Sequence, residues 1–193
     1  MRLAVSLRFA LQFSRSQDIL RRYFVVNGFD GALTMLGLLT GFYLGGAADL
    51  GIVIGVCLGA AVALGISGVT SAYLSESAER RRMLSELEQA MVSDLSDSAH
   101  ANAARLIPML TGLVNGAAPV SMSLLIIVPL WLARAGVALP LPPVPCAIAT
   151  ALLCIFGLGV FLGRVGGTSW LWSGIKTVSV GLLTIALIFL LDR

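Results

Sequence analysis

Charged residues are scarce in this sequence: Asp, Glu, Lys and Arg make up 12% of its 193 residues, whereas soluble domains carry about 25%. Hydrophobic residues make up 58%, and the mean hydropathy is +0.94. Several apolar runs reach the length of about 20 residues that a helix needs to cross a bilayer. This composition excludes an ordinary soluble domain and predicts an all-α polytopic membrane protein.

Histidine and cysteine are also scarce. The one histidine, His100, has no Cys or His neighbour at the spacing of metal ligands, which argues against a zinc site. The three cysteines, Cys57, Cys146 and Cys154, lie in apolar runs and are interpreted as small buried residues. The sequence has no HExxH motif, Ser/His pair or Cys/His nucleophile arrangement, so it does not predict an enzyme. It also lacks the basic and aromatic stripes of nucleic-acid-binding proteins.

Five apolar runs are expected to span the membrane, and together they account for most of residues 23–193. In the second run a small residue recurs every four positions from Gly51 to Ser71, a pattern that lets helices pack closely. In the third run Pro119 is expected to kink the helix and to free the carbonyl of Asn115. The expected spans are residues 23–44, 51–74, 106–131, 146–162 and 170–191.

Two segments outside the spans carry most of the charge. Residues 1–22 are basic and favour an amphipathic helix on the membrane surface and a solvated tail equally. Residues 75–105 connect the second and third spans, and their charged part, residues 75–100, is expected to continue the second span as a helix into water. One face of this helix is apolar and able to pack on a partner helix. That face is formed by Leu84, Leu87, Met91 and Leu95.

Arginines are distributed unevenly over the two sides that five spans define. With the N-terminus inside, ten arginines are cytoplasmic, whereas Arg134 and Arg193 lie on the far side and Lys176 lies within a span. Because positive residues favour the cytoplasmic side, the sequence predicts that the N-terminus is inside and the C-terminus outside. We expect an integral protein of the cytoplasmic (inner) membrane of a prokaryote. The cytoplasmic arginines are Arg2, Arg8, Arg15, Arg21, Arg22, Arg80, Arg81, Arg82, Arg105 and Arg164.

The first span contains a carboxylate, Asp30, which shares a helical face with Asn27 and Thr34 at positions i−3 and i+4. An ionisable side chain within a span costs several kcal/mol, so it usually faces the interior of the protein and marks a function. Asp30 is therefore the central candidate of the sequence.

Three other spans have a polar residue at a similar depth. Ser67, Asn115 and Lys176 lie, like Asp30, about 9 to 15 Å below the cytoplasmic boundary. We expect these residues and the two polar neighbours of Asp30 to line one transport pathway. Its carboxylate, amide and hydroxyl groups suit a divalent cation or a proton relay. Two alternatives remain for Lys176: a structural ion pair with Asp30, or a side chain that reaches towards the membrane surface.

Three stretches resemble the vacuolar iron transporter (VIT) family, which transports iron and manganese. They are NGFDGALT with LGLLTG in the first span, GISGVTSAYLSESAER at the end of the second, and WSGIKTVSVGLLTIALIFLL in the last. The resemblance implies a homodimer with a path between its subunits that exports Fe²⁺ or Mn²⁺ from the cytoplasm as a proton antiporter. It implies a transported metal ion and no tightly bound cofactor.

The resemblance also assigns roles to residues. The membrane aspartate of the family corresponds to Asp30, and its cytoplasmic metal-collecting carboxylates correspond to Glu76, Glu79 and Glu86. This sequence departs from the family at Gly68, where members often have a methionine, so it lacks a soft thioether ligand there. Its connector is also shorter than the helical metal-binding insert of the family.

A second hypothesis, of a different class, is a non-transporting membrane scaffold or accessory subunit. It would assemble through the small-residue stripe of the second span and dock a partner on the helix at residues 76–100. Transport predicts a metal flux that depends on Asp30, whereas a scaffold predicts no flux under any gradient.

Overall fold

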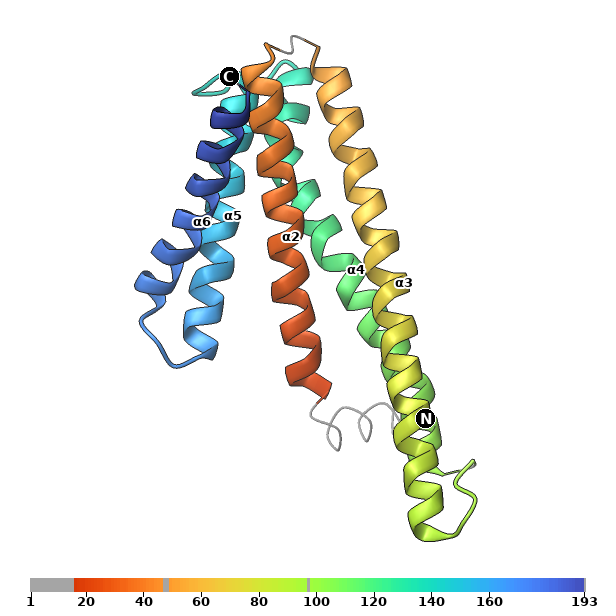
Figure 1. The fold of residues 1–193 in the computed structure, drawn as a ribbon. Coiled ribbons are helices and arrows are strands. Elements are labelled where there is room, and N and C mark those ends of the chain that lie inside the picture. Colours follow the sequence, from red (N-terminus) through yellow and green to blue (C-terminus); the bar gives the residue numbers. More distant parts are fainter. Residues whose placement is uncertain (1–15, 47–48, 97, 193) are drawn as a thin grey trace. The chain divides into compact units, whose positions relative to one another are not determined.

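The structure, a computed structural model, describes residues 16–46, 49–96 and 98–192, and all regular structure in these ranges is α-helical (Figure 1). Each of the five helices there is long and apolar enough to cross a membrane. The all-α class with five candidate spans is therefore confirmed. Residues 1–15, where most of the predicted surface helix falls, lie outside the described residues. The helices are α2 (Ser16–Leu44), α3 (Leu50–Met91), α4 (Ala99–Arg134), α5 (Pro143–Val165) and α6 (Trp170–Leu191).

The chain forms two compact units, each of which is described by itself. Unit 1 consists of Met1–Phe24 and Gly65–Ala117, and unit 2 consists of Val25–Leu64 and Ala118–Arg193. Three helices, α2, α3 and α4, contribute one part to each unit, whereas α5 and α6 belong to unit 2 alone.

Unit 2 has an apolar core to which α2, α3, α4 and α5 contribute. Within this unit α5 and α6 lie side by side, and the turn between them is at the end opposite to the last turn of α6 (Figure 1). Glycines let the two helices approach, since a Cβ on Gly163 would lie 2.8 Å from the Cβ of Ser173. Of the three cysteines predicted to be buried, Cys57 belongs to the core, whereas Cys146 and Cys154 are half-buried. The core consists of Ala32, Met35, Leu36, Leu39, Val53, Ile54, Cys57, Ile126, Ile127, Leu130, Val144, Ala147, Ala151 and Ile155.

Unit 1 contains the charged extension of α3. The helix expected to continue from the second span does so as far as Met91, but the expectation that it extends to residue 100 is wrong. Val92 has a φ of 52°, and the N–H of Ser93 donates to the carbonyl of Glu88 at 3.3 Å, which closes the helix end.

The residues after this end favour turns over helix. The side chain of Asp94 accepts a hydrogen bond from the backbone N–H of Ser96 at 2.8 Å. Serine and aspartate compete with helical hydrogen bonds in this way. The same bond lowers the pKa of Asp94. The chain turns here and returns as α4 from Ala99.

The helices α4 and α5 are each followed by a glycine in a left-handed conformation, where α3 has Val92. Gly136 and Gly167 follow these helices with φ values of 82° and 66°. The N–H of Val137 then donates to the carbonyl of Leu132 at 3.0 Å, which satisfies a carbonyl at the end of α4. Within its length α4 remains helical through Pro119.

Candidate functional site

Asp30 lies on α2 in unit 2, and its side chain is exposed. Among the described residues it forms no hydrogen bond and no ion pair. It shares its helical face with Asn27 and Thr34, which are both half-buried. The carboxylate thus sits on an exposed face of α2, and no charge among the described residues of the same unit neutralises it.

Lys176 does not neutralise Asp30. Both residues belong to unit 2, and the described residues contain no ion pair between them. The Nζ of Lys176 instead lies 5.8 Å from the centre of the Trp172 ring, one turn nearer the start of α6. The side chain therefore points towards that helix end.

The backbone next to Asp30 is held firmly. A Cβ on Gly31 would lie 2.6 Å from the Cα of Pro119 and 2.8 Å from its carbonyl oxygen, so α2 and α4 touch backbone to backbone. The same carbonyl accepts a hydrogen bond from the buried hydroxyl of Ser123 at 2.7 Å. This contact between two helices of unit 2 sets the position from which the Asp30 side chain extends.

Asn115 lies in unit 1 and is buried against α3. Its Nδ2 donates to the carbonyl of Gly68 at 2.7 Å. Glycines at positions 112 and 116 complete the contact, since a Cβ on either would meet Val69. Hydrogen bonds and small residues of this kind hold helices together in membranes. The amide that we expected to line the pathway is thus engaged in packing α3 on α4.

Gly68 is explained by this packing. A Cβ at this position would lie 3.0 Å from the carbonyl oxygen of Asn115 and 3.1 Å from the Cα of Gly116. Both contacts are with backbone, which cannot rotate away. A larger side chain such as that of methionine therefore has no room at this position.

Two of the three glutamates expected to collect metal are paired with arginines. Arg80 donates to Glu76 at 2.8 Å, and the side chains of this pair are only 14% and 13% exposed. Arg82 donates to Glu86 at 2.9 Å. Its pKa is raised by the hydrogen bond and charge of Glu86 and by the charge of Glu79. In the described ranges no group of three or more His, Cys, Asp or Glu residues is placed to hold a metal ion.

The remaining predicted residues are placed as follows. Ser67, in unit 1, is exposed on α3. The apolar face expected to dock a partner is partly covered, because Leu84, Leu87 and Leu95 are half-buried while Met91 is 58% exposed. Neither unit, taken by itself, gathers the predicted pathway residues into one cluster.

Sequence reasoning missed the contact between Gly31 and Pro119 and the two buried hydroxyls of α4. Ser123 bonds to the proline carbonyl, whereas the hydroxyl of Thr111 is buried without a hydrogen-bond partner among the described residues. The position of Ser123 four residues after a proline was a usable signal, because a serine hydroxyl often bonds to the carbonyl four residues earlier.

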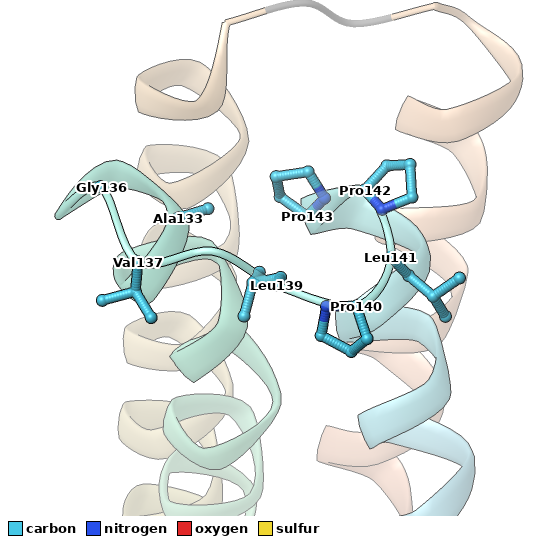
Figure 2. Close-up of a pocket in the computed structure, with 8 residues that line it drawn as sticks. All are labelled: Ala133, Gly136, Val137, Leu139, Pro140, Leu141, Pro142 and Pro143. Atoms are coloured by element: carbon cyan, nitrogen blue, oxygen red, sulfur yellow. The ribbon is translucent and has the colours of Figure 1, made fainter.

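A hollow of about 480 Å³ lies beside the link between α4 and α5 (Figure 2). It is bordered by apolar side chains, which include Pro140, Pro142 and Pro143, and by no charged or hydroxyl side chain. It therefore offers no side-chain ligand for a metal ion.

One curated relative is similar to nearly the whole chain. The uncharacterized protein MJ0645 of Methanocaldococcus jannaschii is 30% identical over 175 residues, which cover 89% of this chain and 88% of the relative. No family model matches the chain, and no solved structure is significantly similar to it.

Proposed function

This chain belongs to the family of the M. jannaschii protein MJ0645, and we propose that it is a membrane transporter that moves a divalent metal ion, Fe²⁺ or Mn²⁺, out of the cytoplasm in exchange for protons. The observation that carries this proposal is the state of Asp30. It is the one carboxylate within the five spans expected from the sequence. Among the described residues it has no partner. The VIT-like stretches described above support the choice of metal.

An unpaired carboxylate facing lipid is strongly unfavourable, because hydrocarbon cannot solvate its charge. Lys176 of the same unit lies over Trp172, and Asp30 has no counter-charge among the described residues. The charge of Asp30 must then be balanced by water or by a cation in a path along the surface of α2. A divalent metal ion is the cation that an oxygen ligand of this kind suits.

A second copy of the chain closes this path in our proposal. Gly55, Gly59 and Ala63 of α3 are exposed, and a Cβ on either glycine would meet no atom within 4 Å. Small residues of this kind let helices of two subunits approach closely. The proposed homodimer has its N-termini in the cytoplasm, because ten arginines then lie on the cytoplasmic side.

The exchange follows from the chemistry of a carboxyl group. Ionised Asp30 attracts the metal ion when the path is open to the cytoplasm. Protonation from the far side removes the negative charge and releases the ion. Alternating access to one site within the membrane is the usual way in which transporters perform such an exchange.

The test is a flux assay with purified protein in liposomes under a pH gradient, with Mn²⁺ and Fe²⁺ supplied in turn. We expect Asp30→Asn to lower the flux at least tenfold, because the neutral side chain cannot bind the ion or exchange a proton. The matched control is Asp192→Asn, which removes an exposed aspartate after the end of α6 and should transport normally. Normal flux in folded Asp30→Asn would exclude the proposal, and no flux in the native protein under any gradient would favour a scaffold.

A further inference from the structure

Lys176 lies in a pair of helices, α5 and α6, that contains no acidic residue. It is the only lysine of the chain, and residues 143–191, which contain the whole of α5 and α6, include no aspartate or glutamate. Its side chain is exposed on α6 and forms no ion pair with any described residue. No described residue therefore supplies an anion for this cation.

The geometry shows where that anion would be. The Nζ of Lys176 lies over the ring of Trp172, so the side chain extends towards the first turn of α6. Trp170 and Trp172 are 50% and 59% exposed there. Exposed tryptophans of membrane helices gather where the bilayer meets water, at the level of the lipid head groups. The ammonium group is thus held at head-group depth.

A second cation lies at the same end of unit 2. Arg164, in the last turn of α5, is exposed and has no ion pair among the described residues. The last turn of α5 packs directly on the start of α6, since a Cβ on Gly163 would lie 3.1 Å from the Cα of Trp170. This end of the hairpin therefore carries two positive charges, exposed tryptophans and no negative charge.

We propose that the α5–α6 end of unit 2 binds the head group of an anionic phospholipid, with Lys176 as the cationic ligand of its phosphate. Trp172 packs along the lysine and keeps its ammonium group at the depth of the phosphate. Charge complementarity selects the anionic lipid, because a zwitterionic head group brings its own cation. This assignment gives Lys176 a role outside the transport pathway and does not depend on the proposed transport.

The single lysine makes a clean test. Binding of dioctanoyl phosphatidylglycerol to the purified protein in a neutral detergent is measured by native mass spectrometry and by the rise in Tm. We expect Lys176→Gln to bind this lipid about fivefold more weakly, the loss of one basic contact with an anionic lipid. Lys176→Arg should bind as the native protein does. Arg134→Gln, which removes an exposed arginine at the end of α4, is the control and should also leave binding unchanged.

Two further measurements, one with a zwitterionic lipid and one with a free phosphate, identify the ligand. Dioctanoyl phosphatidylcholine should raise the Tm much less than phosphatidylglycerol, and glycerol phosphate, which has no acyl chains, should not compete. If Lys176→Gln does not fold, acetylation of the folded native protein neutralises Lys176 and the N-terminal amine only, with acetylated Lys176→Arg as its control. Undiminished phosphatidylglycerol binding after either change, or equal stabilisation by phosphatidylcholine, would overturn the proposal. Full competition by glycerol phosphate would also overturn it, in favour of a free phosphate as the ligand.

Discussion

Gly68 and Asp30 show how single residues constrain this protein in opposite ways. Gly68 has no free space, because the backbone of α4 lies against its Cα, and the amide of Asn115 bonds to its carbonyl. Asp30 has free space and no partner among the described residues. The first position is explained by packing alone, whereas packing gives no reason for a carboxylate at the second.

Gly68→Ala should destabilise the protein by about 1 to 3 kcal/mol, the usual cost of forcing extra volume into a packed contact. The added methyl group would press on the Asn115 carbonyl and on the Cα of Gly116. The measurement is the free energy of unfolding in detergent. Gly157→Ala is the control, because a Cβ at Gly157 would meet no atom within 4 Å. A Gly68→Ala protein as stable as the control variant would show that this crossing is looser than described.

At the scale of helices, the end of α3 carries local strain. Val92 adopts a φ of 52°, a left-handed conformation that disfavours a β-branched side chain. The helices α4 and α5 use glycine at the corresponding position. The strain is confined to the turn between α3 and α4, outside the apolar core.

Val92→Gly should therefore stabilise the turn by about 1 kcal/mol, the cost of a left-handed conformation for a residue with a Cβ. Hydrogen exchange at the amide of Ser93, which bonds to the carbonyl of Glu88, is expected to slow by about fivefold. Met91→Gly, one residue earlier and still helical, should have the opposite effect. Faster exchange in Val92→Gly would contradict the account of this helix end.

Ion pairs in the charged extension of α3 change the role expected of its glutamates. The resemblance to the VIT family implied that Glu76, Glu79 and Glu86 collect metal. The structure pairs two of them with arginines, and the pair of Glu76 and Arg80 is largely buried. A buried ion pair is costly to break. A metal ion would have to displace an arginine at Glu76 and at Glu86, so our proposed pathway does not include these two glutamates.

At the scale of the whole molecule, composition was enough to predict five apolar helices, because run length and hydropathy alone decide which segments can cross a bilayer. The candidate site was harder to predict. Depth along a span places Asn115 and Lys176 near Asp30 in height, but depth carries no information on the direction of a side chain. Asn115 turns to Gly68, and Lys176 turns to Trp172.

The central claim is that Asp30 faces water and a passing cation, not lipid. The most direct test is thiol labelling of Asp30→Cys, in a background without the three native cysteines, by a cationic reagent that does not cross the membrane. Leu183→Cys on α6 is the lipid-facing control, since Leu183 is 58% exposed, and it should remain unlabelled. We expect Asp30→Cys to be labelled, because a path open to water reaches this position. An Asp30→Cys protein as unreactive as the Leu183→Cys control would contradict the account.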